Sequence, residues 1–330
     1  MTKKSTLNIA IFGIGAMGSL FGSRLSGLAQ VTLIGNWAEQ IETIRRDGLT
    51  TSYPDGHQAH HTLPITNDLA EVPPADLALV LVKSYQTDRA AQQARQVLKP
   101  NGLVVTLQNG LGNLEILAEA VGPLRAGLGI TAQGATMLAP GHLYHAGQGP
   151  THLAQIPGRE KRLTEVAALF NAAGLETTVV DNADSLVWGK LAINAGINPL
   201  TALLELPNGA LAEDESLCQV MAAAASEVAQ VAAAQGIHLP YLDAARRAAE
   251  VSKATASNRS SMLQDVSRAA PTEIDAISGA VVRFGQRLGI PTPVNEFLLR
   301  LVKAKETGRM FDPQQVRLLT QALGRAYSLA

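Results

Sequence analysis

A glycine-rich segment close to the N-terminus has the spacing that binds the phosphates of a dinucleotide. Residues 13–18 follow the apolar run Leu7–Phe12 and open a helical pattern, which is the strand–turn–helix context that a G-x-G-x-x-G motif requires. Gly13 would make the tight turn, Gly15 would admit the pyrophosphate, and Gly18 would let the helix pack closely on the strand. A glycine-rich turn without a ligand is the alternative, but the context favours dinucleotide binding. The residues predicted here to bind the cofactor are Gly13, Ile14, Gly15, Ala16, Met17 and Gly18.

A lysine and two asparagines recur at every fourth position later in the chain. Lys190, Asn194 and Asn198 have mostly apolar neighbours, and residues four apart share one face of an α-helix. An ammonium and two carboxamides in one stripe could bind a polar substrate, because buried groups of this kind need polar partners. The stripe could equally be the hydrated edge of a helix, and the spacing alone favours neither interpretation.

The end of the second predicted strand bears on which dinucleotide is bound. NAD enzymes usually place an acidic residue there to bind the ribose 2′-hydroxyl, whereas NADP enzymes tend to place an arginine nearby. This chain has Asn36 at that position, and the missing carboxylate favours NADP. Lys83, at the end of the third parallel run, could supply a positive charge for the 2′-phosphate or could be an ordinary solvated lysine.

Two further polar segments lie in the second half of the chain. Residues 260–265 read Ser-Ser-Met-Leu-Gln-Asp, and residues 271–275 read Pro-Thr-Glu-Ile-Asp. Pro271 followed by Thr272 and Glu273 predicts the start of a helix, with Glu273 as a first-turn carboxylate. Spacing alone makes neither segment catalytic.

The composition limits the classes of function. The chain has 330 residues, a formal net charge of −1 and 46% hydrophobic residues. Its length predicts two domains, and its charge predicts no basic surface for nucleic acid. Glycines interrupt the N-terminal apolar stretch, so neither a signal peptide nor a membrane span is expected. We therefore expect a cytoplasmic protein that binds neither nucleic acid nor a membrane.

Metal and thiol chemistry are not indicated. His57, His60 and His61 come nearest to a metal-ligand cluster, but they stand in a turn-rich stretch and are interpreted as exposed loop residues. The single cysteine, Cys218, excludes an intrachain disulfide, which fits a reducing compartment. Because no histidine is paired with it in a recognisable motif, we predict neither a metal site nor a nucleophilic cysteine.

The first half of the chain carries the pattern of an α/β domain. Apolar runs rich in valine, isoleucine and leucine alternate with helical segments. Runs without polar alternation predict strands buried on both faces, so the pattern indicates a doubly wound Rossmann sheet covered by helices. The predicted strands are 7–12, 31–34, 77–82 and 103–107, and the predicted helices are 17–28, 37–46 and 87–98.

Turn-rich stretches interrupt this alternation. The Pro-Asp-Gly turn at 54–56 predicts a hairpin within residues 48–66. Residues 124–155 also have an antiparallel pattern, with a turn at 140–141, and 176–180 is the last predicted strand.

The remainder is rich in alanine and leucine, with prolines near the expected helix starts, and predicts a mostly α-helical domain. We place an NADP-binding Rossmann domain at 1–181 and a helical substrate and dimerisation domain at 182–330. Alanine-rich faces at 220–235 and 276–288 could pack in a homodimer or form the core of a monomer. The predicted helices are 183–195, 213–236, 240–253, 272–288, 293–305 and 312–327.

Four motifs, in the same order along nearly the whole chain, resemble the ketopantoate reductase (2-dehydropantoate 2-reductase) family. The resemblance implies an N-terminal Rossmann domain and a helical C-terminal domain. It also implies NADPH-dependent reduction of a small 2-keto acid, 2-dehydropantoate, to pantoate in the pathway to coenzyme A. The motifs are Gly13–Gly18, Gln108-Asn109-Gly110, Trp188-Gly189-Lys190 with Asn194 and Asn198, and Ser261–Asp265 with Thr272–Asp275.

The resemblance further implies a role for each matching residue. Lys190 would hydrogen-bond the keto oxygen and act as the general acid, while Glu273 would support the lysine and orient the nascent hydroxyl. Asn109 would lie near the nicotinamide, so it counts among both the cofactor-binding and the substrate-binding residues. The residues implied to hold the substrate's hydroxyl and carboxylate are Asn194, Asn198 and Ser261.

The chain departs from the family at Asn36, where members commonly carry an arginine that helps to bind the 2′-phosphate. With Lys83 retained, NADP(H) stays the expected cofactor, and the weakened preference leaves NAD as a second possibility. The alternative activity is that of an NAD(P)-dependent D-2-hydroxyacid dehydrogenase acting on another small 2-keto acid. A non-catalytic nucleotide sensor is disfavoured, because a sensor would need only the loop and not Lys190 and Glu273.

Overall fold

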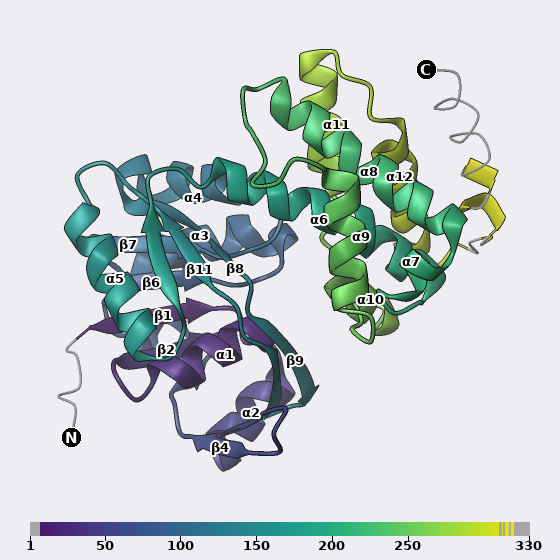
Figure 1. Ribbon diagram of the computed structural model, residues 1–330. Helices are drawn as coiled ribbons and strands as arrows, with labels where there is room; N and C mark the ends of the chain where they lie inside the picture. Colours follow the sequence, from purple (N-terminus) through teal and green to yellow (C-terminus); the bar gives the residue numbers. More distant parts are fainter. Residues whose placement is uncertain (1–6, 310–311, 313, 317, 320–330) are drawn as a thin grey trace. The chain divides into compact units, whose positions relative to one another are not determined.

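The computed structural model confirms an α/β unit followed by a helical unit (Figure 1). Residues 1–108 and 112–183 form the first compact unit, and residues 109–111 and 184–330 form the second. The short segment 109–111 therefore groups with the helical unit, although it lies within the first half of the chain. The structure describes residues 7–309, 312, 314–316 and 318–319.

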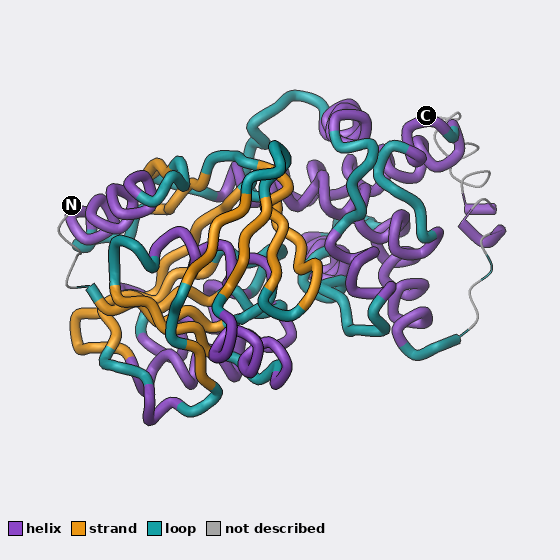
Figure 2. The backbone as a smooth tube through the Cα atoms, turned by 90° about the horizontal axis from the view of Figure 1, so that it is seen from below, coloured by secondary structure: helices purple, strands orange, loops and turns teal. Residues whose placement is uncertain are grey.

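The first unit is built on an eight-stranded sheet with the order β12-β11-β8-β7-β6-β1-β2-β5. Figure 2 draws the strands in orange and the helices in purple. From β5 to β8 the neighbouring strands are parallel; β11 is antiparallel to β8 and parallel to β12. The strands are β1 (Asn8–Phe12), β2 (Gln30–Ile34), β5 (Ile65–Thr66), β6 (Ala75–Val80), β7 (Leu98–Thr106), β8 (Ala126–Thr131), β11 (Thr151–Ala154) and β12 (Thr177–Val180).

Both faces of the parallel strands are buried, as the continuous apolar runs predicted. Along β1, Ile9 and Ile11 join the core on one face, whereas Ala10 and Phe12 join the core on the other. This alternation follows from the two-residue period of a strand. The first core contains side chains of α1, α2 and α5, and the second contains those of α3 and α4. The helices are α1 (Ala16–Leu25), α2 (Ala38–Asp47), α3 (Thr87–Val97), α4 (Asn113–Val121) and α5 (Glu160–Ala172).

Three of these five helices were predicted, and α4 and α5 were not. The three 3₁₀ turns that connect the elements were also not predicted. They are η1 (Leu69–Glu71), η2 (Ser84–Gln86) and η3 (Pro123–Arg125).

A second, four-stranded sheet with the order β4-β3-β10-β9 arises from the two turn-rich stretches. Both predicted antiparallel pairs are confirmed: β3 pairs with β4, and β9 pairs with β10. The interpretation of the histidines as loop residues is wrong for His60 and His61, which lie on β4, because the hairpin extends beyond the turn. The strands are β3 (Leu49–Ser52), β4 (Gln58–His61), β9 (Gly134–Ala139) and β10 (His142–Gly147).

All regular secondary structure in the described part of the second unit is helical. Their apolar faces enclose one core that includes Trp188, Met221 and Leu298. The predicted helix 312–327 falls largely outside the described residues. The helices are α6 (Asp184–Leu204), α7 (Ala210–Glu213), α8 (Glu215–Ala233), α9 (Ala244–Ala254), α10 (Ser261–Ser267), α11 (Ser278–Leu288) and α12 (Pro293–Glu306).

Helix α6 is longer than predicted and contains Pro199, which was expected near a helix start. A proline supplies no N–H to the carbonyl four residues earlier, so it usually ends or bends a helix. Here packing of α6 against α8, α9, α10 and α12 outweighs that local preference. The consequence is one uninterrupted helix through residues 190–198.

Two other predicted helix starts are wrong. Helix α9 begins at Ala244 and not near Pro240, because the carboxylate of Asp243 caps it by accepting from the Arg246 N–H at 2.9 Å. Helix α11 begins at Ser278 and not at Thr272. Before it the chain forms a turn, in which the Glu273 carbonyl accepts from the amides of residues 276 and 277. Among the described helices, none is long and apolar enough to span a bilayer.

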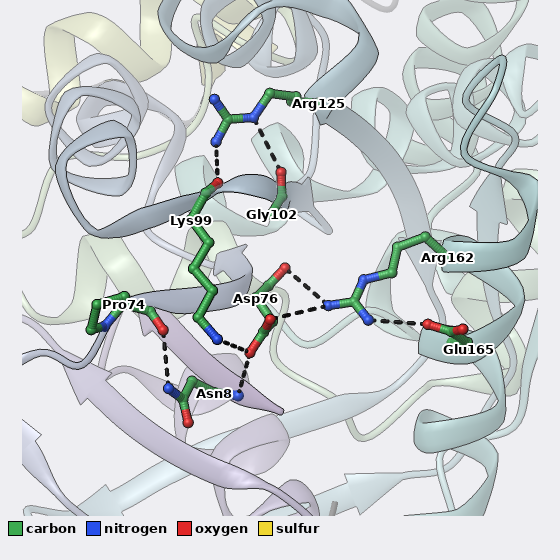
Figure 3. A network of polar contacts seen from close by, with 8 residues as sticks. All are labelled: Asn8, Pro74, Asp76, Lys99, Gly102, Arg125, Arg162 and Glu165. Carbon is green, nitrogen blue, oxygen red and sulfur yellow. Dashed lines mark hydrogen bonds and ion pairs between the residues drawn. The ribbon is translucent and has the colours of Figure 1, made fainter. Parts of the chain in front are cut away.

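A network of hydrogen bonds and ion pairs joins four elements at the amino-terminal end of the parallel strands (Figure 3). The Asp76 carboxylate accepts from the Asn8 N–H at 3.0 Å and from Lys99 Nζ at 2.8 Å, and Arg162 lies 3.7 Å away. Burial, the largest single influence, would raise the pKa of Asp76, but the Lys99 and Asn8 hydrogen bonds and the two cations together lower it. The network thus connects β1, β6, β7 and α5 through one carboxylate.

We predict that Asp76→Asn lowers the free energy of unfolding at pH 7 by about 1–3 kcal/mol, because Lys99 and Arg162 lose their shared anion. A carboxyl whose pKa is depressed by folding stabilises above its unfolded pKa of about 3.9 and loses that contribution as pH falls through the folded value. The difference between variant and wild type should therefore shrink in acid. Urea titrations across pH measure it. Asp47→Asn, in the exposed pair with Arg46, is the control and should leave stability nearly unchanged, because solvent screens exposed ion pairs. Equal effects of the two substitutions would contradict the prediction.

Candidate functional site

The glycine-rich loop connects β1 to α1 in a conformation that depends on two of its glycines. Gly13 has φ +117°, and a Cβ there would lie 2.6 Å from the Leu81 carbonyl carbon. A Cβ on Gly18 would lie 1.7 Å from the Gly13 carbonyl oxygen. Side chains at these positions are therefore excluded by backbone, as the motif predicted for the tight turn and the close helix–strand approach.

Gly15 differs from the other two glycines, because a Cβ on it would meet no described atom within 4 Å. It is the N-cap of α1, and among the described residues no side chain caps this helix and no acidic residue stands in its first turn. Backbone N–H groups at a helix start attract anions. The residues therefore fit a phosphate group: space at Gly15, available amide donors and no competing carboxylate.

A buried glutamine that sequence analysis missed holds this loop in place. Gln40, on α2, has no exposed surface, and its Nε2 donates to the Ile14 carbonyl at 3.1 Å and to Ser19 Oγ at 3.2 Å. Its Oε1 accepts from the Gly141 N–H at 2.7 Å. The available signal was a glutamine on the same helix face as the apolar Ile41 and Ile44, since a polar residue on a buried face needs such partners.

The other two predicted cofactor residues of the first unit follow strands on either side of β1. Asn36 is exposed just after β2, and Lys83 is partly buried just after β6. Because these strands are parallel, their carboxyl ends and the glycine loop share one edge of the sheet, the edge at which such sheets bind ligands. Gln108 Nε2 donates to the Val82 carbonyl at 2.8 Å and so fixes the backbone next to Lys83.

The three residues of the predicted stripe lie on α6 in the second unit. With a rise of 1.5 Å per residue, about 6 Å along the axis separates Lys190 from Asn194, and about 12 Å separates it from Asn198. Asn198 is buried, with 6% of its surface exposed, and Asn194 is partly buried. Neither carboxamide is hydrogen-bonded within the described part of the chain. Buried polar groups of this kind are normally satisfied by ligand or water.

Lys190 is a partly buried ammonium whose charge is balanced by Glu273. Burial lowers the pKa of Lys190 to about 8, and the negative charge of Glu273 acts in the opposite direction. Glu273 is itself buried, with 6% of its surface exposed. A lysine with a pKa near neutrality can both hold and release a proton under physiological conditions, which is what acid–base catalysis needs.

The predicted residue Asn109 is brought to the turn that carries Glu273. The Leu111 N–H donates to the Ala276 carbonyl at 3.0 Å, which joins segment 109–111 to turn 273–277. Gly110 has φ +83°, and a Cβ there would lie 2.5 Å from the Ala276 oxygen, so this approach requires glycine. Asn109, Glu273 and Lys190 are thus all part of the second unit.

The serine pair at the start of α10 lies beside the far end of the stripe. Ser260 is buried and caps α10 by accepting from the Leu263 N–H at 3.0 Å, and its hydroxyl is 2.7 Å from Thr201 Oγ1. Thr201 in turn donates to the Asn198 carbonyl at 3.0 Å. The predicted Ser261 is the first residue of α10 and is partly buried. Ser260 is thus a structural residue that the sequence did not distinguish from its neighbour.

The chain is similar to known proteins over most of its length. Residues 9–158 match the model of ketopantoate reductase PanE/ApbA, and residues 182–306 match that of the ketopantoate reductase PanE/ApbA C terminal. The chain belongs to the ketopantoate reductase family. Curated relatives named 2-dehydropantoate 2-reductase include those of Halobacterium salinarum, 39% identical over 300 residues, and Vibrio cholerae, 33% identical over 304 residues. The matches cover 90% and 91% of this chain and 98% of each relative.

Solved structures show the same fold. A PanE/ApbA family ketopantoate reductase from Ralstonia eutropha JMP134 superposes with a TM-score of 0.84 at 32% identity, covering 92% of this chain and 99% of that one. D-mandelate dehydrogenase, in a ternary structure with NADH and anilino(oxo)acetate, has a TM-score of 0.85 at 29% identity with the same coverage. The family consists of NAD(P)-dependent oxidoreductases that act on small keto acids, so this member is an enzyme of that class.

The family member described here therefore distributes its candidate residues over two units. Gly13–Gly18, Asn36 and Lys83 lie in the α/β unit, and the catalytic candidates and substrate candidates lie in the helical unit. Among the described residues, no group of histidine, cysteine and carboxylate side chains could hold a metal ion.

The geometry of the loop predicts that one alanine substitution affects nucleotide binding and another affects stability. Gly15→Ala should leave the melting temperature nearly unchanged, because its Cβ enters open space, but should weaken nucleotide binding by crowding the phosphates. Gly18→Ala should destabilise the protein by several kcal/mol, because its Cβ would overlap the Gly13 carbonyl. Thermal unfolding and nucleotide titration calorimetry separate the two effects. Unchanged nucleotide affinity in Gly15→Ala would place the phosphates elsewhere.

Proposed function

We propose that this enzyme reduces 2-dehydropantoate to pantoate with NADPH, in the route to pantothenate and coenzyme A. The observation that carries the proposal is the polar face of α6: a lysine with a pKa of about 8 beside Glu273, followed by two carboxamides without partners in the described chain. A small keto acid offers a carbonyl, a hydroxyl and a carboxylate to such a face. The curated relatives bear the name of this activity.

Held by the glycine loop Gly13–Gly18, a reduced nicotinamide cofactor would supply the hydride that the ketone carbon receives. As negative charge develops on the keto oxygen, the Lys190 ammonium donates a hydrogen bond and then a proton to it, which yields the alcohol. Glu273 keeps the ammonium charged and orients the new hydroxyl. Asn194, Asn198 and Ser261 hold the hydroxyl and carboxylate of the substrate, and Asn109 contacts substrate and nicotinamide. Lys190 is then reprotonated from solvent.

NADPH is the proposed cofactor because Asn36 occupies the position after β2 where NAD enzymes usually have a carboxylate, which would repel a 2′-phosphate. Asn36 is exposed there, and Lys83 adds a positive charge after the neighbouring strand β6. Arg45 and Arg46 are engaged elsewhere: Arg45 donates to the Ile65 carbonyl and Glu71, and Arg46 pairs with Asp47.

Further assignments belong to the same proposal. Residues 1–181 serve as the NADP-binding domain and residues 182–330 as the substrate and dimerisation domain of a homodimer. A formal charge of −1 supports an enzyme that does not bind nucleic acid, and a single cysteine supports a cytoplasmic location.

A second candidate is an NAD-dependent D-2-hydroxyacid dehydrogenase. It is favoured by the structural likeness to D-mandelate dehydrogenase in complex with NADH and by the missing arginine at Asn36. Curated relatives across most of the chain carry the reductase name, which makes the first candidate the stronger one.

The deciding experiment measures oxidation of NADPH and NADH in the presence of 2-dehydropantoate and, separately, of a bulky aromatic 2-keto acid. We expect efficient turnover of 2-dehydropantoate with NADPH.

Lys190→Ala should lower kcat by about 10²–10⁴-fold without affecting nucleotide binding. In the wild type, kcat should fall as pH rises through about 8, because the general acid loses its proton. Preference for the bulky acid with NADH would instead support the second candidate, and a Lys190→Ala enzyme within a few-fold of wild type would remove the general-acid role.

Asn36→Arg should strengthen NADPH binding by about tenfold while leaving NADH binding nearly unchanged, because a surface guanidinium adds about 1–1.5 kcal/mol on a phosphate. Fluorescence titration with both nucleotides measures this change. Asn36→Gln is the matched neutral control. Equal gains for both nucleotides would show that the 2′-phosphate does not lie near this position.

A further inference from the structure

The turn that carries Glu273 is fastened to the last residue of α12. Glu306 Oε1 accepts two hydrogen bonds from Thr272, one from its N–H and one from its hydroxyl, each 2.7 Å long. The Glu306 side chain is only 12% exposed. Two short bonds to an ionised, largely buried acceptor are stronger than neutral ones, so the residue directly before Glu273 has a defined position.

Neighbouring contacts strengthen the same attachment. Thr272 Oγ1 also accepts from the Ile274 N–H at 3.2 Å, so the hydroxyl connects both sides of Glu273. Lys303 Nζ lies 3.2 Å from Glu306 Oε2 and 2.8 Å from Asp275 Oδ2, which ties the other side of the turn to α12. Arg283 also donates to the Asp275 carbonyl at 3.1 Å, and the Lys190 ammonium interacts with the Glu273 carboxylate.

We infer that Glu306 is a positioning residue for the catalytic pair: through Thr272 it holds the Glu273 carboxylate beside the Lys190 ammonium. This inference rests on the proposed roles of Lys190 and Glu273, but it concerns Glu306, which belongs to none of the four sequence motifs. A carboxylate that moves away from a partly buried ammonium stabilises its charge less, because the Coulomb energy falls with distance. Release of the turn should therefore lower the pKa of Lys190.

The pKa of Lys190 measures this positioning directly. In the full-length protein, the rate at which acetic anhydride modifies Lys190 is followed by mass spectrometry from pH 6 to 10. Burial and Glu273 set the present value of about 8. Glu306→Ala should shift the titration to lower pH, in the direction of Glu273→Gln, and should reduce kcat about ten- to a hundredfold with a smaller change in KM. Glu306→Gln keeps an acceptor oxygen for Thr272 and should largely restore both quantities.

Two further variants distinguish loss of this contact from a general loss of folding. Thr272→Val removes one of the two bonds to Glu306 and should give a smaller shift in the same direction. Glu296→Ala removes an exposed carboxylate of α12 that pairs with Arg300 and lies about 15 Å along the helix from Glu306; it should leave the Lys190 titration unchanged.

The labelling experiment needs no turnover, so it is independent of the substrate assignment. Absence of 2-dehydropantoate reduction by the wild type would remove the proposed function, whereas the Lys190 titration would still test Glu306. If Glu306→Ala lowered only the melting temperature and left the Lys190 pKa and kcat at their wild-type values, Glu306 would be a purely structural residue and the inference would be overturned.

Discussion

Partial burial of one ammonium group constrains much of the second unit. Taking Lys190 out of water disfavours its charged form, and the nearby carboxylate of Glu273 acts against that effect, leaving a pKa of about 8. Glu273 lies in a turn before α11, and other elements hold the backbone of this turn. Segment 109–111 contacts one end of this turn, and α12 holds the other.

The continuity of α6 is the second requirement. Lys190, Asn194 and Asn198 form one face only if the helix continues past the point where Pro199 would favour a break. Packing against neighbouring helices supplies that continuity. Thr201, on the same helix, then reaches Ser260 and sets where α10 begins. One long helix thus carries the polar residues Lys190, Asn194 and Asn198. The residues that interact with α6 come from a turn and from the start of α10.

The first unit achieves its geometry through parallel strands. Because β2, β1 and β6 are neighbours with the same direction, the glycine loop, Asn36 and Lys83 share an edge without any direct contact between them being needed. Two glutamine amides, one buried and one partly buried, stabilise that edge: Gln40 holds the loop, and Gln108 holds the chain before Lys83. Each satisfies backbone groups that regular secondary structure leaves unpaired where a strand ends.

The sequence by itself determined the features that depend on near neighbours. The glycine spacing, the apolar runs and the fourfold repeat of Lys190, Asn194 and Asn198 reflect local sterics and the periods of strand and helix, so the loop, the sheet and the polar stripe could be predicted. Only the tertiary structure decided that Pro199 lies within a helix, that Glu273 lies in a turn beside Lys190, and that Gln40 and Glu306 support the site. These depend on which distant segments meet and how much water they exclude, and neither burial nor long-range contact is encoded in the spacing of one short motif.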